Sequence, residues 1–263
     1  MSELVETEFQ GVVFEIVLNR PEKRNAIDGR LWAAFGEAVR EAGRTTGARA
    51  VLVRGAGKGF SAGIDVSAFF QLSDHYGDDW LGRMRTITDD FQRVLTSLER
   101  LELPTIAQIH GHCLGLGMEL ALACDFRIAA AGTMLGLPES RLGLIPDVGG
   151  TTRLTRLVGP ARAKELIMTG KQIDAGLAAS WGIVNRVVPM DELQKASQEL
   201  IADLQKAAPL AIGMAKRVID GLVDTDRGLQ LEGWAQSQLV SSQDFTEGVQ
   251  SFVQKRPPEF KGK

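Results

Sequence analysis

Apolar residues in the first half of the chain alternate between short continuous runs and longer stretches with helical spacing. The runs are rich in β-branched residues and end at glycine, proline or asparagine, which predicts buried strands at 12–18, 50–54, 105–110 and 126–130. Between these strands lie two apolar stripes, the first of which follows Asp28, a residue suited to cap a helix. The stripes consist of Leu31, Phe35, Ala38, Val39, Ala42, Met84, Ile87, Phe91, Val94, Leu95 and Leu98. Parallel strands need such crossover helices, so the pattern predicts an α/β fold.

The pattern changes after residue 150, where helical spacing dominates. One short apolar run, 184–188, lies among predicted helical segments at 160–169, 175–181, 190–206, 209–222 and 227–241. We therefore expect an α/β core over residues 1–195 and a helical region over residues 196–263.

Charge and cysteine content exclude several classes of protein. The 263 residues carry 30 Lys and Arg against 33 Asp and Glu, a formal charge of −3, whereas nucleic-acid binding calls for a basic face. Two cysteines and three histidines lack the spacing of a disulfide framework or a zinc site. The N-terminus lacks the apolar core of a signal peptide, and no apolar run reaches the roughly 18 residues of a membrane helix. We expect a cytoplasmic protein with reduced thiols, no metal, and no nucleic-acid or membrane partner.

Two glycine-rich stretches follow predicted strands, in a chain whose 29 glycines are its one compositional skew. Stretch 54–65 contains GFSAG, which formally matches the nucleophile elbow of serine hydrolases, but no histidine base follows His112. Stretch 110–125 runs into a predicted helix at 116–124, and unpaired N–H groups at a helix N-terminus favour developing negative charge. Glu119 lies in the first turn of this helix, where it serves chemistry or simply satisfies the helix dipole.

Two carboxyl groups stand among apolar residues in a third segment, 134–154. Glu139 and Asp147 each follow a proline there. If burial raises the pKa of such an acid, it becomes suited to general acid–base catalysis. Alternatively, both acids cap helices or bind Arg141 and Arg153, and the residues after Asp147 are a reasonable helix start.

Together, in their order and spacing, these segments resemble the crotonase superfamily, the enoyl-CoA hydratase/isomerase family. The likeness covers nearly the whole chain, through the segments 18–27, 57–65, 111–130, 135–154, 169–188 and 247–263. It implies a spiral of β-β-α units closed by a helical C-terminal region that builds homotrimers, often paired into hexamers. It also implies an acyl-CoA thioester as the substrate and no separate cofactor, since coenzyme A is part of the substrate.

The resemblance also assigns residues. Backbone N–H groups of Ala62 and Leu116 would form the oxyanion hole around the thioester oxygen, where each such donor contributes about 3–4 kcal/mol in the transition state. Glu119 would position and activate water, and Glu139 would protonate the α-carbon. The family commonly has glycine where Leu116 stands, but the group used is a main-chain N–H. The substrate-binding residues would be Lys23, Arg24, Ala26, Phe60, Gly63, Ile64, Asp65, Gly115, Gly117, Pro138 and Asp147.

The resemblance favours one reaction and leaves others open. Because both acid positions hold glutamate, it favours an enoyl-CoA hydratase, which reversibly adds water to a trans-2-enoyl-CoA and gives a 3-hydroxyacyl-CoA. An enoyl-CoA or dienoyl-CoA isomerase that uses Glu139 and Asp147 is the alternative, because dienoyl-CoA isomerases resemble this chain in carrying that aspartate. A non-catalytic acyl-CoA-binding protein would be expected to lack one acid. Four aromatic residues of the region 66–85 suit an acyl pocket or an apolar helix face equally well: Phe69, Phe70, Tyr76 and Trp80.

Overall fold

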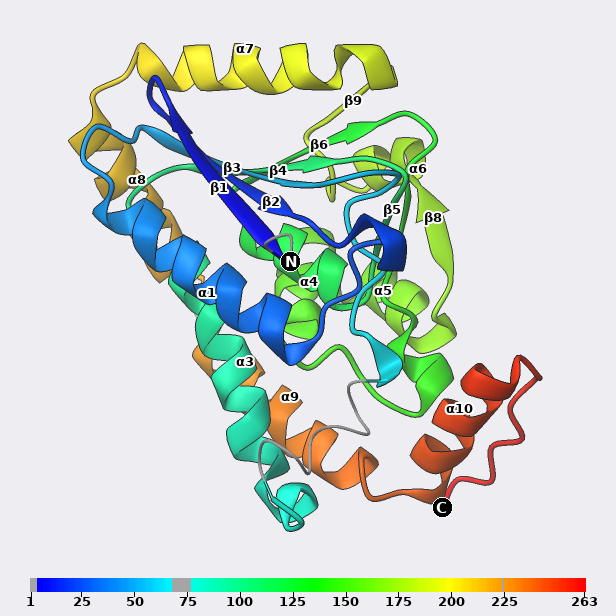
Figure 1. Ribbon diagram of the computed structural model, residues 1–263. Coiled ribbons are helices and arrows are strands. Elements are labelled where there is room, and N and C mark those ends of the chain that lie inside the picture. The colour runs from blue at the N-terminus through cyan, green and yellow to red at the C-terminus, as the bar shows by residue number, and fades with distance from the viewer. Residues whose placement is uncertain (1–3, 68–76, 224) are drawn as a thin grey trace.

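A six-stranded, mostly parallel sheet forms the frame of the protein, whose computed structural model describes residues 4–67, 77–223 and 225–263 (Figure 1). The strand order is β1-β2-β3-β4-β6-β9, and β1 pairs with β2 antiparallel while the other neighbours are parallel. These strands are β1 (Val5–Gln10), β2 (Val13–Leu18), β3 (Ala50–Gly55), β4 (Thr105–Ile109), β6 (Phe126–Ala130) and β9 (Arg186–Val188). A smaller sheet contains β5 (His112–Leu114), β7 (Met134–Gly136) and β8 (Gln172–Asp174).

Helices connect the strands and then dominate the second half of the chain. The first begins as predicted, because the Asp28 carboxylate accepts a hydrogen bond from the Leu31 N–H at 2.9 Å. The α-helices are α1 (Gly29–Arg44), α3 (Met84–Glu99), α4 (Leu116–Ala123), α5 (Gly150–Thr169), α6 (Ala175–Ser180), α7 (Leu193–Gln205), α8 (Pro209–Gly221), α9 (Asp226–Leu239) and α10 (Gln243–Gln254). Short 3-10 helices are η1 (Pro21–Lys23), η3 (Trp80–Arg83), η4 (Pro138–Leu142) and η5 (Met190–Glu192).

The large sheet is covered on both faces. Successive side chains of a strand point to opposite faces, so each central strand contributes to two apolar cores. Leu52 and Ile106 belong to a core formed with α7, whereas Val51, Val53 and Ala107 belong to the larger core that contains α1, α3 and α4. Figure 1 shows α7 along one face of the sheet and α1 with α4 along the other. Burial on both faces explains the continuous apolar runs of the central strands.

Several elements differ from the sequence prediction, among them the short strands β5, β7 and β8 of the smaller sheet, which were not predicted. Strand β1 was not predicted, because it is an edge strand in which only Val5 is buried. Helix α5 begins ten residues earlier than predicted. The prediction placed its start too late because the kink at Gly159 and Pro160 has the sequence of a helix start. Helix α10 was also missed, because its polar residues outnumber its buried apolar ones.

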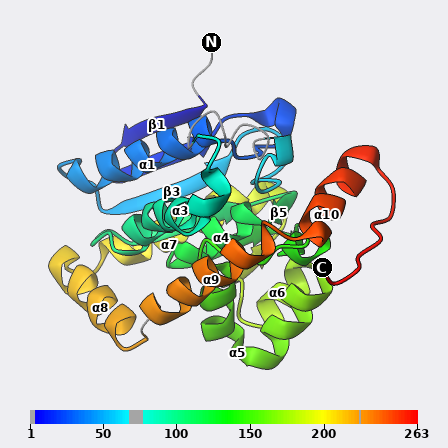
Figure 2. The same ribbon diagram turned by 90° about the horizontal axis from the view of Figure 1, so that it is seen from below.

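The C-terminal helices return to the α/β core (Figure 2). Helix α9 packs against α3 and α5, and α10 packs against η4. Among the described residues, no helix combines the length and apolar character that a membrane crossing requires. The contacts of α9 bring Gln236 to the cavity described next.

Candidate active site

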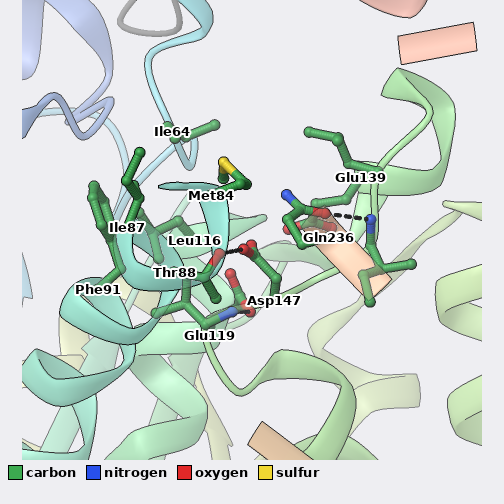
Figure 3. Close-up of a pocket in the computed structure, with 13 residues that line it drawn as sticks. Ile64, Met84, Ile87, Thr88, Phe91, Leu116, Glu119, Glu139, Asp147 and Gln236 are labelled. Carbon is green, nitrogen blue, oxygen red and sulfur yellow. Dashed lines mark hydrogen bonds between the residues drawn. The ribbon is translucent and has the colours of Figure 1, made fainter. Parts of the chain in front are cut away.

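A cavity lies where α3, α4, η4 and α9 meet (Figure 3). Its cavity volume is about 60 Å³, and the empty space reaches about 560 Å³ when the open mouth is included. Its walls are mainly apolar, and three carboxyl groups, one hydroxyl and one amide supply the polar groups. The lining consists of Ile64, Met84, Ile87, Thr88, Phe91, Leu116, Glu119, Glu139, Leu144, Ile145, Asp147, Val148 and Gln236.

The segment after β3 supplies a main-chain donor to this cavity, although from a different residue than predicted. The Ala62 N–H donates to the Arg24 carbonyl at 3.0 Å, so the predicted donor at Ala62 is already occupied. Ile27 bonds to both neighbours of Ile64, accepting from the Asp65 N–H and donating to the Gly63 carbonyl, each at 2.8 Å. In this parallel bridge the Ile64 N–H points away from Ile27, and it has no acceptor in the described part of the chain.

The N-terminus of α4 supplies a second donor. Leu116 is the first residue of this helix, so its N–H has no acceptor within the helix. Gly115 precedes it at φ +52°, a conformation that favours glycine. A Cβ atom on Gly115 would lie 3.2 Å from Glu139 Oε1 and 3.7 Å from Gly63 Cα. Both donor segments therefore converge beside the Glu139 carboxyl group.

Glu119 is held at the bottom of the cavity by backbone hydrogen bonds. Its side chain is buried, and Oε1 accepts from the Val148 N–H at 2.9 Å and the Gly150 N–H at 2.8 Å. Burial raises the pKa of Glu119 well above its usual range, and the negative charges of Glu139, Asp147 and Glu232 add to this rise. The Gly150 hydrogen bond opposes the rise, because it favours the ionised form.

Glu139, on η4, is half-buried, and one of its carboxyl oxygens is buried without a partner. Its Oε2 atom has no hydrogen bond within the described residues. Burial raises the pKa of Glu139 to about 8; its own backbone N–H opposes this rise, and the charges of Asp147 and Glu232 add to it. The negative charge of Glu139 adds to the raised pKa of Glu119, so ionisation of one carboxyl opposes ionisation of the other.

Asp147 faces the same cavity from the loop before α5. Its Oδ2 atom accepts from the Thr88 hydroxyl at 2.8 Å, and its carbonyl accepts from Gln92 Nε2 at 2.6 Å. Burial raises the pKa of Asp147 to about 6, against the opposing Thr88 hydrogen bond. The alternative structural roles do not occur, since α5 has no side-chain cap and Arg153 pairs with Glu99 at 2.8 Å.

Helix α9 contributes two residues that sequence reasoning missed. Gln236 lines the cavity, and its Oε1 atom accepts from the Ile145 N–H at 3.4 Å. Glu232, one turn earlier, binds the start of α5. Their signal in the sequence is weak: both are polar residues on the helix face that also carries Leu229 and Gly233. No motif marks that face as part of a site.

Several residues predicted to bind substrate have structural contacts instead. Phe60 is fully buried in the main core, and Gly117 gives Ser61 room to pack against α4. The Asp65 carboxylate pairs with Arg20 at 2.9 Å. Ser61 is buried and donates to a backbone carbonyl, so the elbow-like sequence around it is structural.

Some of the remaining predicted residues are described by the structure but do not line the cavity, and others lie outside the described residues. Lys23 and Arg24 are exposed, Ala26 is half-buried and Pro138 begins η4. None of these four is among the residues that line the cavity. Trp80 packs against the apolar cluster that contains Met84 and Ile87. The other aromatic residues considered for an acyl pocket lie outside the described residues: Phe69, Phe70 and Tyr76.

Comparison with known proteins places this geometry in context. A family model described as enoyl-CoA hydratase/isomerase matches residues 8–263. The probable enoyl-CoA hydratase 2, mitochondrial, of Arabidopsis thaliana is 37% identical over 253 residues, which cover 95% of this chain and 82% of that protein. The carnitinyl-CoA dehydratase of Salmonella typhi is 37% identical over 273 residues, which cover 100% of both chains.

A solved structure is similar over the full length. The crystal structure of carnitinyl-CoA hydratase from Mycobacterium avium has a TM-score of 0.86 and 32% identity, and covers 100% of both chains. This similarity confirms the crotonase-like α/β fold with a helical C-terminal region that the resemblance implied. Within the described ranges, no group of three or more His, Cys, Asp or Glu side chains is arranged to hold a metal ion.

Proposed function

Because the chain belongs to the enoyl-CoA hydratase/isomerase family, we propose that it catalyses the reversible addition of water to a trans-2-enoyl-CoA. The product is a 3-hydroxyacyl-CoA. The observation that carries this proposal is the convergence of two main-chain donors, at Ile64 and Leu116, on a cavity that also holds Glu119 and Glu139.

The two donors suit the charge that develops in this reaction. Addition of water at the β-carbon of an enoyl thioester passes through an enolate-like state with negative charge on the thioester oxygen. The Ile64 and Leu116 N–H groups would bind that oxygen, and the α4 N-terminus favours the charge. These donors bind the transition state more strongly than the substrate, because the oxygen gains its negative charge only as the reaction proceeds.

The two carboxyls divide the proton transfers. Glu119 accepts two backbone N–H bonds, which favour placing the negative charge of the pair on Glu119. It would accept a proton from the attacking water. Glu139, with Oε2 unpartnered, keeps its proton and would donate it to the α-carbon. Dehydration follows the same path in reverse.

Asp147 supports isomerisation as a second candidate. It lines the same cavity as Glu139, and its Oδ2 atom accepts a hydrogen bond from the Thr88 hydroxyl. A second carboxyl placed along the acyl chain could return a proton to a carbon further from the thioester. Carnitinyl-CoA dehydratases among the relatives also show that this fold serves acyl groups other than simple fatty acids.

The rest of the ligand and the assembly are proposals from surface features. Lys23 and Arg24 are exposed near the donor segment, and the tail residues Lys255 and Lys261 add positive charge, so these cations suit the CoA phosphates. Helix α8 exposes an apolar face that suits contact between copies in a homotrimer or hexamer. This face consists of Leu210, Met214, Val218, Ile219 and Leu222.

The test is a comparison of two substrates on the purified protein. We expect loss of enoyl-CoA absorbance with crotonyl-CoA, and a much slower reaction with a 3,5-dienoyl-CoA. Faster turnover of the dienoyl-CoA would favour the isomerase. Binding of either ester without turnover would show a non-catalytic binder and contradict both enzymatic proposals.

A further inference from the structure

Glu232 is a buried carboxylate of α9 that binds the start of another helix. Its residue exposure is 3%. Oε2 accepts from the Gly149 N–H at 2.7 Å, and Oε1 accepts from the Thr152 N–H at 2.6 Å and the Thr152 hydroxyl at 2.5 Å. It does not line the cavity, and its role in the protein is therefore separate from substrate contact.

The first N–H groups of α5 are divided between two carboxylates from different helices. Glu119, on α4, accepts from Val148 and Gly150, whereas Glu232, on α9, accepts from Gly149 and from Thr152 two residues beyond Gly150. Gly149 has φ +96°, which turns its N–H away from those of its neighbours. Each carboxylate therefore fixes the backbone that the other binds.

Other side chains fix the carbonyl groups of the same segment. Gln92 Nε2 donates to the Asp147 carbonyl at 2.6 Å, and Arg153 Nη1 donates to the Val148 carbonyl at 3.0 Å. Glu232 supplies hydrogen bonds that join this segment to α9. Removal of this carboxylate would leave buried N–H groups unpaired and free the peptide planes to rotate.

We propose that Glu232 is a positioning residue, which holds residues 148–152 so that two N–H groups stay aimed at Glu119. The kinetic part of this inference rests on the proposed hydratase function. Because a bound and oriented Glu119 is needed in the reaction and not for CoA binding, loss of Glu232 should lower kcat and leave KM nearly unchanged.

The charge of Glu232 gives a readout that a purely structural role would not move. The charged groups that interact with it are the carboxyls of Glu119, Glu139 and Asp147. Burial raises the pKa of Glu232 to about 7, and its ionised form raises the pKa of both catalytic glutamates. A neutral replacement should lower both pKa values and move the pH profile of kcat toward lower pH.

The test uses Glu232→Ala and Glu232→Gln in the full chain, with crotonyl-CoA as substrate. For Glu232→Ala we expect kcat to fall about 10- to 100-fold with KM within about twofold of wild type. Glu232→Gln keeps an acceptor oxygen, so it should lose less activity but still shift the pH profile. Ser197→Ala is the matched control, because it removes a buried hydroxyl of α7 that bonds only to the Leu193 carbonyl.

Backbone amide exchange tests the same inference without activity. In both Glu232 variants, amides of residues 148–150 should exchange faster than in wild type, while the Ser197→Ala control leaves them protected. If wild type turns over no enoyl-CoA, the proposed function fails while the exchange result still decides the role of Glu232. Wild-type exchange in both variants, or kcat and a pH profile like those of the control, would overturn the proposal.

Discussion

Two glutamates share one cavity but have opposite surroundings. Glu119 lies on a regular helix, and its Oε1 atom accepts two backbone N–H bonds from the start of α5. Glu139 lies on a short 3-10 helix, and its buried Oε2 atom has no partner in the described part of the chain. Burial and neighbouring negative charges raise the pKa of both, but the hydrogen bonds that each side chain accepts are different.

This difference assigns a separate role to each acid. A carboxylate that already accepts two N–H bonds is fixed in place and suited to hold negative charge. A carboxyl with one buried oxygen that lacks a partner is costly to ionise and suited to keep a proton until substrate arrives. The comparison therefore predicts that the two glutamates respond differently to substitution and to pH.

The largest expected effect is on turnover, when Glu139 is replaced by a side chain that cannot donate a proton. Glu139→Gln should lower kcat for hydration of crotonyl-CoA by about 10³-fold, because an amide cannot transfer a proton to carbon. KM should change little, since the shape of the side chain is kept. Glu41→Gln, on the exposed face of α1, is the control. A loss smaller than about tenfold would remove Glu139 from the proposed acid role.

The second prediction concerns stability. The pKa of Glu139 is about 8 in the folded protein against 4.5 for a free side chain, so folding opposes its ionisation. Its contribution to stability is fully present below pH 4.5 and is lost as pH rises toward 8, by an amount on the order of 4 kcal/mol. Glu139→Gln should therefore be more stable than wild type at pH 8 and similar at pH 4.5. Denaturant unfolding at both pH values measures this, and equal stabilities at pH 8 would show that Glu139 is not buried as an acid.

The third prediction sharpens the assignment of the proton to Glu139. If Glu139 is the acid, kcat should fall about tenfold per pH unit above pH 8, because its protonated form is lost. Initial rates at saturating substrate across this range give the profile. A kcat that stays level or rises above pH 8 would place the working proton elsewhere.

The smallest expected effect concerns the third acid of the cavity. Asp147→Asn should lower hydration only about threefold, since the Thr88 hydroxyl can still donate to the amide oxygen. Any activity toward a 3,5-dienoyl-CoA should fall further than hydration does. Thr88→Val, which removes the hydroxyl, is the companion variant. If Asp147→Asn lowers hydration as much as Glu139→Gln does, Asp147 is also needed for hydration, and the proposal that only Glu119 and Glu139 transfer protons is wrong.

The sequence predicted most of the fold because hydrophobic burial dictated it. Strands β2, β3, β4 and β6 are buried on both faces and appear as apolar runs, and Asp28 marks the start of α1. Strand β1 escaped prediction because an exposed edge leaves no such run. The kink at Gly159 hid the first turns of α5, since local backbone preference at glycine and proline competes with the helical pattern.

The family resemblance, and not the spacing of residues, assigned most of the site. Four of the residues that it assigned line one cavity: Leu116, Glu119, Glu139 and Asp147. The donor at Ala62 was wrong by two residues, because which N–H is free depends on pairing with the distant residues Arg24 and Ile27. Glu232 and Gln236 reach the site through tertiary packing of α9, which no spacing in the sequence reveals.

The use of main-chain donors has a consequence for how such a protein can change over time. Ile64 and Leu116 line the cavity, and in the proposed reaction the N–H groups of the same residues bind the thioester oxygen. A substitution at either position would change which acyl groups fit. It would leave the main-chain N–H donor in place unless the new residue is proline. Selectivity for the acyl group can therefore change during evolution while the two main-chain N–H donors are kept.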